Sequence, residues 1–457
     1  MENKPVQYLE GSQEKCQRCK QETAVLISRK EKFCKTCFIR FIRGKQRKQM
    51  QDDKYKVKYG EVAENLGSQK VLLAFSGGIS SLVLLDVIAS LLQEQNLQHK
   101  GKQGFELIVL SLDEWEINSL NKKFQDVLPQ ILANYSPVEI KFKVLSLDSY
   151  ILDESTLEKI SVNTKFEGFT EMIPKDQIKD LKLIDLLNKC PNKSSIEDLL
   201  ITVYDELILQ TAYQERCSTI LYGHSMTRIA NEIIALTVKG RGSTVYQSVA
   251  DHSRTYRNET FQIIFPLREI LYAEIITYCQ LSDLNQYIIE STIPKSKITR
   301  NLTIRDLTTN YFTQLDATGY ASTASTVVRT GEKLGAPTDP VLSKCQICDV
   351  NIHQDPSKWL ARITVADPAP IETDEERKYA ELYHLEKPVI NSPQSESVPL
   401  NVCYGCLVTL NGIKSESGFI WPVKHEDDGK NLLNLTYVAT NTQAILDEYV
   451  LTDNEDD

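Results

Sequence analysis

Eight of the eleven cysteines form four Cys-x-x-Cys pairs, a spacing that suits metal binding. Each pair presents two thiolates from a tight turn, and two such turns complete a tetrahedral set of four sulfur ligands. Without a secretory signal, this spacing favours metal ligation over disulfides. The predicted ligands are Cys16, Cys19, Cys34 and Cys37 for a first site, and Cys345, Cys348, Cys403 and Cys406 for a second.

Zinc is the metal expected at both sites, because closed four-thiolate sites are typical of structural zinc. An iron–sulfur cluster or a redox-active pair is the alternative for the first site. The two C-terminal pairs are separated by 54 residues, which include His353. A lone histidine is more often a surface residue than a ligand, so His353 is not expected to bind the metal. Neither set leaves an open position for catalysis, and the predicted role is to hold the fold.

The segment VLLAFSGGISS, residues 71–81, has the composition of a phosphate-binding loop. An apolar run leads into Ser-Gly-Gly, and a helix-like apolar run follows. Paired glycines allow a tight turn whose backbone N–H groups converge on an anion, and the following helix adds the positive end of its dipole. The predicted contacts to a pyrophosphate are Ser76, Gly77, Gly78 and Ser81.

Residues 29–58 contain twelve Lys or Arg and three Asp or Glu, so they carry +9 on a chain whose net charge is −10. Such a segment suits contacts with the phosphate backbone of RNA or DNA, and a tRNA-sized ligand would explain it. The alternatives are a solvated charged helix here and a plain turn at VKGRG, residues 238–242. The predicted tRNA-binding residues are Arg40, Arg43, Lys45, Arg47 and Lys48, together with Lys239 and Arg241.

These motifs need elements to position them, and the sequence predicts an α/β domain. Short apolar runs rich in β-branched residues alternate with helical stretches such as 196–216. This alternation is typical of a doubly wound, mostly parallel sheet, whose strands end at the ligand-binding edge. The predicted strands are residues 70–75, 105–113, 138–148, 218–223 and 261–267.

Composition divides the chain into four predicted units. They are an N-terminal zinc ribbon with a basic helix (1–60), the α/β domain (61–335), a C-terminal zinc-binding module with an acidic insertion (336–425), and a segment with an acidic tail (426–457). The chain is 41% apolar and 25% charged, as in ordinary globular proteins. We find no apolar run of the about 18 residues that span a membrane, and no secretory signal. A cytoplasmic protein without a membrane partner is therefore expected.

The strand followed by SGGISS resembles the SGGxDS signature of the PP-loop ATP pyrophosphatase family, whose members adenylate a carbonyl oxygen and release pyrophosphate. The segment GHSMTRIANE, residues 223–232, resembles the second motif of that family, a GHNxxD-like loop after the fourth strand. Together with Cys-x-x-Cys pairs near both ends, these motifs resemble the two-zinc-site tRNA thiolation branch of the family. The resemblance spans nearly the whole chain and implies a PP-loop ATPase-like fold.

The chain departs from the catalytic pattern of that branch at several positions. Ser80 stands where the signature has Asp, and Thr227 and Arg228 stand where an acidic pair is expected. The helical stretch 197–210 lacks the expected Cys-x-x-Cys and its paired basic residues, and the segment 288–297 lacks a further cysteine. Magnesium beside the phosphates needs carboxylates, and sulfur transfer needs a thiolate or a cluster. The chain is therefore identified as a degenerate member with no catalytic residue.

The resemblance implies a non-catalytic, tRNA-binding subunit that forms a heterodimer with an intact catalytic paralogue. It also implies that the complex 2-thiolates the wobble uridine of tRNAs for Lys, Glu and Gln, with sulfur from a thiocarboxylated ubiquitin-related modifier. Two structural zinc ions are the implied cofactors, and ATP binding is an open question. Two alternatives stay open: an active ATP-dependent tRNA sulfurtransferase or adenylyltransferase, and a zinc-ribbon RNA-binding scaffold unrelated to thiolation.

Overall fold

The computed structural model describes residues 5–9, 11, 13–50, 52–59, 69–152, 157–163, 166–173, 181–293, 302–320, 322–356, 358–359, 373–386, 398–411 and 419–424. The predicted acidic tail, 426–457, and parts of the acidic insertion lie outside these residues. Within the described ranges, no helix has the length and apolar character needed to span a membrane.

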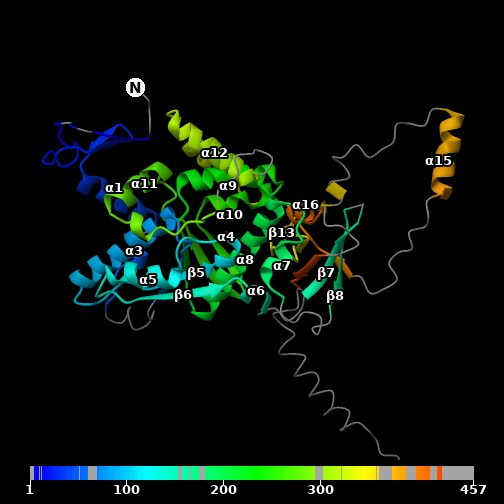
Figure 1. Ribbon diagram of the computed structural model, residues 1–457, viewed down its shortest axis with the longest axis horizontal. Helices are drawn as coiled ribbons and strands as arrows, with labels where there is room; N and C mark the ends of the chain where they lie inside the picture. Colours follow the sequence, from blue (N-terminus) through cyan, green and yellow to red (C-terminus); the bar gives the residue numbers. More distant parts are fainter. Residues whose placement is uncertain are drawn as a thin grey trace, which may run out of the picture.

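A six-stranded sheet with the order β10-β11-β9-β4-β5-β6 lies at the centre of the α/β domain (Figure 1). Every neighbouring pair is parallel except β10 and β11. The five predicted strands are confirmed, whereas the short polar edge strand β10 was not predicted. The strands are β4 (Lys70–Ala74), β5 (Glu106–Asp113), β6 (Ile140–Ser146), β9 (Thr219–Tyr222), β10 (His252–Tyr256) and β11 (Glu259–Ile264).

Helices cover both faces of this sheet, as predicted for a doubly wound domain. On one face, Val71 and Leu73 of β4 pack with α3 (Ile79–Gln98), α5 (Phe124–Ala133) and α11 (Tyr272–Leu281). On the other face, Leu72 packs in a core to which the remaining long helices contribute. These are α8 (Lys193–Gln214), α9 (Met226–Val238), α12 (Ile304–Ala317) and α13 (Ser322–Glu332), with the short α10 (Val245–Val249). Successive residues of a strand point to opposite faces, which accounts for the two separate cores.

Short elements complete the α/β domain and its surroundings. They are η1 (Asp52–Tyr55), α4 (Trp115–Asn118), α6 (Ser149–Leu152), α7 (Leu183–Leu187), η3 (Gly242–Thr244) and η4 (Asn285–Tyr287). Two of them, α4 and α7, contribute residues to the walls of a cavity.

The N-terminal module is a three-stranded antiparallel sheet followed by one helix. Its elements are β1 (Val6–Tyr8), β2 (Leu26–Ser28), β3 (Glu31–Phe33) and α1 (Lys35–Gln49). The rings of Phe33 and Phe38 lie 5.8 Å apart, and Phe38 and Ile42 are buried against the core that contains α3 and α11. The helix α1 carries half of the Lys and Arg residues of the predicted basic segment, and its apolar face attaches it to the α/β domain.

The C-terminal module is built around a four-stranded sheet with the order β14-β8-β7-β15. The strands β7 (Leu157–Val162) and β8 (Gly168–Met172) come from the predicted second unit, whereas β14 (Val398–Leu400) and β15 (Phe419–Pro422) come from the third. Strands from both predicted units therefore share one sheet. The boundary near residue 335 stays a prediction. The module also contains β12 (Ser343–Lys344), β13 (Asn351–Ile352) and α16 (Tyr404–Leu410), while α15 (Asp374–Glu386) stands apart in Figure 1.

A buried carboxylate, Glu274, attaches the N-terminal module to α11. Its Oε1 accepts hydrogen bonds from Ser28 Oγ at 2.9 Å and Arg29 Nε at 2.7 Å. Its Oε2 accepts from Arg29 Nη2 at 2.8 Å and from the backbone N–H of Leu271 at 2.9 Å. Glu274 is fully buried, so these donors replace the water that the charge loses.

Replacing Glu274 with Gln is expected to lower the free energy of unfolding by about 2 kcal/mol, because the partly buried Arg29 loses its counter-ion. The matched control is Glu94→Gln, which weakens the more exposed pair with Arg47 and should cost less than about 1 kcal/mol. Urea unfolding of both variants measures the difference. A larger loss in Glu94→Gln would contradict this ranking.

Candidate functional site

Two loops meet at the carboxyl edge of the central sheet. Residues 76–78 follow β4, and residues 223–225 follow its parallel neighbour β9. A Cβ added to Gly223 would lie 3.0 Å from the Cα of Ser81, so the second loop packs directly on the first turn of α3. The structure therefore brings together the two loops that the sequence analysis linked, at the position where doubly wound sheets bind ligands.

The first loop is covered on one side. Gly77 has a φ of +76°, which favours glycine, and a Cβ there would lie 2.6 Å from the Cβ of Ile289. The backbone N–H of Ile289 donates to the Gly77 carbonyl at 3.0 Å, and the ring of Phe124 closes the same side. Ile289, which belongs to the stretch that lacks the expected cysteine, thus lies against the glycine loop.

The four predicted phosphate contacts differ in exposure. Gly77 and Ser81 are buried, whereas Ser76 is exposed and Gly78 is half-buried. The Ser81 hydroxyl donates to the Gly78 carbonyl at 2.9 Å and lies 3.2 Å from the Ser76 hydroxyl. The loop therefore satisfies its own hydroxyl groups, and only Ser76 and Gly78 face outward.

Neutral or basic groups occupy the positions at which the family pattern has carboxylates. Ser80 lies in the first turn of α3, and the Thr227 hydroxyl accepts the backbone N–H of Tyr272 at 3.1 Å. Arg228 is exposed and lies 3.8 Å from Glu232 on the next turn of α9. At these three positions, no oxygen anion is available for magnesium.

An aromatic group beside this loop stays neutral. The imidazole of His224 stacks on Phe265 with ring centroids 5.3 Å apart and an interplanar angle of 18°. Burial, and next the positive charge of Arg228, lower the pKa of His224 from 6.5 to about 4. At neutral pH this side chain is therefore an uncharged stacking partner.

Internal ion pairs occupy the face of α8 where cysteines and basic residues were expected. Asp205 lies 3.5 Å from Arg254 on β10. Glu206 accepts a hydrogen bond from the Tyr256 hydroxyl at 2.6 Å and pairs with Lys424. Burial raises the pKa of Glu206, but Lys424 outweighs it and the pKa ends below its usual value. The two carboxylates are thus neutralised within the chain.

The eight predicted thiols form two groups of four, and within each group the sulfur atoms lie within 4.8 Å of one another. The Sγ atoms of Cys19 and Cys34 are 3.8 Å apart, and those of Cys348 and Cys403 are 3.7 Å apart. A tetrahedral ion with metal–sulfur bonds of about 2.3 Å requires sulfur atoms about 3.8 Å apart. The donors therefore fit a four-coordinate metal, and His353 belongs to neither group.

The same type of helix cap holds one cysteine pair of each group. Cys34 caps the N-terminus of α1 and accepts the N–H of Cys37 at 3.4 Å, while Cys403 caps α16 and accepts the N–H of Cys406 at 3.4 Å. Such N–H groups and the positive helix end favour the thiolate. In the other turn of each group, the residue after the second cysteine, Lys20 or Asp349, has a positive φ.

The basic helix α1 directs its cations to two sides. Arg40 and Lys48 are exposed, and neither is in an ion pair within the described ranges. Lys45 pairs with Glu269 at 3.6 Å, and Arg47 pairs with Glu94. Two of the predicted tRNA-binding residues thus face solvent freely.

Arg43 instead joins an interior network around Asp86. The Arg43 Nε donates to the Tyr278 hydroxyl at 3.1 Å. The hydroxyls of Tyr278 and Tyr135 each donate to the Asp86 carboxylate at 2.6 Å, and Arg43 lies 3.7 Å from it. Asp86 was not predicted, although an aspartate inside the apolar run LVLLDVIASLL was a signal for a buried polar partner.

Lys239 and Arg241, the other predicted tRNA contacts, are largely buried. Lys239 pairs with Glu197 at 3.1 Å and with Asp198 at 2.8 Å. Arg241 lies against the Sγ of Cys406 at 3.8 Å. Burial lowers the pKa of Arg241, but the nearby cysteine sulfurs outweigh it and raise the pKa. Their tRNA role stays a prediction, and the geometry places both residues between the α/β domain and the C-terminal module.

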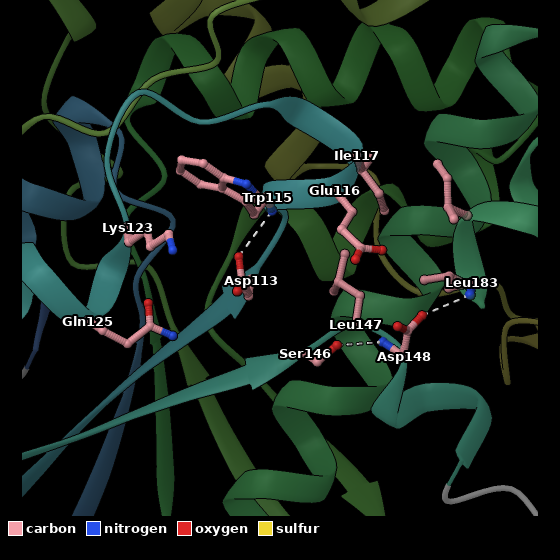
Figure 2. A pocket seen from close by; sticks show the side chains of 11 residues that line it. Asp113, Trp115, Glu116, Ile117, Lys123, Gln125, Ser146, Leu147, Asp148 and Leu183 are labelled. Carbon is pink, nitrogen blue, oxygen red and sulfur yellow. Dashed lines mark hydrogen bonds between the residues drawn. The ribbon is translucent and has the colours of Figure 1, made fainter. Parts of the chain in front are cut away.

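A cavity of about 440 Å³ opens at the carboxyl ends of β5 and β6 (Figure 2). Its lining includes the half-exposed Trp115 and three carboxylates, those of Asp113, Glu116 and Asp148. The Asp148 carboxylate accepts the backbone N–H of Leu183 at 2.8 Å. This cavity was not predicted, because no sequence motif marks it. Its acidic lining disfavours an anionic ligand such as a nucleotide.

The imidazole of His224 is expected to titrate near pH 4 in the folded chain. The unfolded chain takes up this proton near pH 6.5, so stability falls as the pH drops through that window. An NMR titration of the histidine ring protons, with His224→Gln to assign the resonance, measures this pKa. A value near 6.5 in the folded chain would contradict the stacked, partly buried environment of His224.

Comparisons with known proteins identify the family. A sequence model described as cytoplasmic tRNA 2-thiolation protein 2 matches residues 303–408. Proteins of that name from Debaryomyces hansenii and Scheffersomyces stipitis are 59% and 56% identical, each over 100% of both chains. Among solved structures, the U34-tRNA thiolase NcsA from Methanococcus maripaludis with its [4Fe-4S] cluster is similar, with 16% identity, a TM-score of 0.47, and coverage of 78% of this chain and 99% of that one. On the strength of its full-length relatives, the chain belongs to the cytoplasmic tRNA 2-thiolation protein 2 family.

Proposed function

We propose that this chain is the non-catalytic, tRNA-binding subunit of a heterodimeric tRNA thiolase. The observation that carries the proposal is the carboxyl edge of the central sheet, which retains a glycine loop without the groups that would make a nucleotide react. Ser80, Thr227 and Arg228 offer no carboxylate for magnesium, and Ile289 covers the loop. Metal-assisted adenylation needs such carboxylates, so the chemistry is assigned to a partner.

The cysteines of this chain support the same conclusion. Eight of them belong to the two four-thiol groups, in which each sulfur can serve as a metal ligand. Burial raises the pKa of Cys190 to about 11, of Cys217 to about 12 and of Cys279 to about 11. These three thiols are therefore protonated at neutral pH, and sulfur transfer requires a thiolate.

The proposed partner is the catalytic paralogue, cytoplasmic tRNA 2-thiolation protein 1. The complex would 2-thiolate the wobble uridine of tRNAs for Lys, Glu and Gln in the cytoplasm, with sulfur from a thiocarboxylated ubiquitin-related modifier. The name shared by the full-length relatives, cytoplasmic tRNA 2-thiolation protein 2, supports this assignment.

Zinc is the metal that we propose for both cysteine groups. Four thiolates at tetrahedral spacing form a closed site, and such sites stabilise folds rather than bind substrates. At the N-terminus the metal would hold the ribbon that leads into α1, and at the C-terminus it would hold α16 against the turn at Cys345. In this proposal, neither metal takes part in the reaction.

For tRNA, we propose a surface centred on the outward side of α1. Arg40 and Lys48 are exposed and unpaired within the described part of the chain, whereas Arg43, Lys45 and Arg47 attach the helix to the α/β domain. An anchored helix keeps its outward cations at fixed positions, which suits recognition of a folded RNA by its phosphates.

The purified chain alone is expected to show no ATP–pyrophosphate exchange, because the carboxylates for magnesium are missing. The same assay on the complex with the catalytic paralogue is the positive control. Exchange by the isolated chain at the rate of the complex would instead support the alternative of an active adenylyltransferase.

The double substitution Arg40→Gln/Lys48→Gln is expected to weaken binding of tRNAs of any sequence. It should also reduce the slope of log affinity against log salt by about 2, one for each lost phosphate contact. The matched control, Lys141→Gln/Lys143→Gln, removes the same charge from the edge strand β6 and should leave the slope unchanged. An equal change in both variants would show that only net charge matters, and no change in either would exclude α1 as the tRNA surface.

A further inference from the structure

Arg241 lies directly against a ligand of the C-terminal cysteine group. Its Nη1 and Nη2 atoms are each 3.8 Å from the Sγ of Cys406, within the range of N–H···S hydrogen bonds. Nη2 also donates to the Thr409 hydroxyl at 3.2 Å and lies 3.8 Å from the Asp198 carboxylate. The Arg241 side chain is only 13% exposed, so these groups replace most of its water.

Two glycines make this approach possible, one on each side of the contact. A Cβ on Gly405 would lie 2.5 Å from the Cγ of Arg241 and 2.7 Å from its Cζ. Gly240 has a φ of +70°, and a Cβ there would lie 2.2 Å from the ring of Tyr404. The turn that carries Arg241 and the turn that carries Cys406 therefore interlock, and a side chain at either glycine would separate them.

A chain of alternating charges continues from this contact into the α/β domain. Asp198 on α8 accepts hydrogen bonds from Lys239 at 2.8 Å and from Arg305 at 2.9 Å. Arg305 on α12 also pairs with Glu232 on α9 at 2.7 Å. The cysteine group is thus connected through opposite charges to three helices of the α/β domain.

We propose that Arg241 is an outer-sphere partner of the C-terminal metal centre, and that metal binding thereby holds the C-terminal module against the α/β domain. This inference rests on the metal occupancy proposed above. Four thiolates around a divalent ion carry a net charge of −2, which the buried guanidinium partly offsets through Cys406. N–H···S contacts also orient the ligand, as other outer-sphere groups do.

The metal-free state explains why the two events are linked. Without the ion, nothing fixes the four sulfur atoms at tetrahedral spacing, and the two N–H···S contacts between Arg241 and Cys406 lose their fixed geometry. A buried cation that loses such partners destabilises the contact that buries it. The N-terminal site differs, since its neighbouring cation Arg18 stacks over Phe33 and pairs with Glu31.

Metal release from the full chain tests the proposal. Metal content is measured by mass spectrometry, and release is followed in excess 4-(2-pyridylazo)resorcinol. In Arg241→Gln, one of two metal equivalents is expected to leave about tenfold to a hundredfold faster than in the unsubstituted chain, and the other at an unchanged rate. Trypsin cleavage at Lys333 or Lys344, which flank the connection between α13 and Cys345, should accelerate in parallel.

Two variants complete the experiment. Arg241→Lys keeps the charge but loses the fork of two N–H groups, so it should release the metal at an intermediate rate. It carries the test alone if circular dichroism shows that Arg241→Gln does not fold. Arg18→Gln removes the cation beside the N-terminal site and should not produce a fast-releasing metal equivalent.

The outcomes separate the inference from its premise. Two bound equivalents with release and cleavage rates unchanged in both Arg241 variants would overturn the outer-sphere role and leave the metal sites standing. Fewer than two equivalents in the unsubstituted chain would overturn the metal occupancy itself, and the inference with it. Faster release without faster cleavage would overturn the proposed link to domain attachment.

Discussion

The parallel pairing of β4 with β9 is the constraint on which the rest of the molecule depends. This pair places the glycine loop and the loop after β9 at one edge, where Gly223 lies against the first turn of α3. Ile289 covers the glycine loop at that edge, and α8 carries internal ion pairs. This edge thus combines a glycine loop with neutral or basic side chains at Ser80, Thr227 and Arg228. A fold can keep such a framework because the strand pairing is stabilised by the buried cores on both faces.

Much of the positive charge serves attachment. Arg29 binds the buried Glu274, Arg43 approaches Asp86, and Arg241 contacts Cys406. In each case a guanidinium from one segment meets an anionic or sulfur group of another, and its fork of donors fixes the orientation. The cysteine modules are therefore fastened to the α/β domain at both ends of the chain, and the proposed tRNA surface on α1 is presented by a rigid support.

Local features of the sequence predicted a large part of this structure. Continuous apolar runs identified the five parallel strands, and their alternation with helices identified the doubly wound sheet. The Cys-x-x-Cys spacing identified both four-thiol groups, because that spacing is a property of a single tight turn. The exposure of individual residues along α1 was harder to predict, because basic and apolar residues alternate and the sequence does not show which side of the helix packs against the domain.

Contacts between distant segments could not be predicted. The hairpin β7–β8 joins strands more than two hundred residues away, and no local pattern reveals such a pairing. The burial of Arg241 depends on the turn at Cys406, and the roles of Gly240 and Gly405 appear only when the two turns meet. Likewise, Ile289 covers the glycine loop through a tertiary contact that the residues around it do not predict.

Thiolation by the reconstituted complex tests the central claim, that this chain supports the reaction without performing it. The measurement is 2-thiouridine formed in tRNA by the catalytic paralogue, with this chain omitted, present, or carrying Ser76→Ala in its exposed loop serine. We predict that omission abolishes thiolation and that Ser76→Ala leaves the rate unchanged. Full thiolation without this chain, or loss of thiolation in Ser76→Ala, would contradict it.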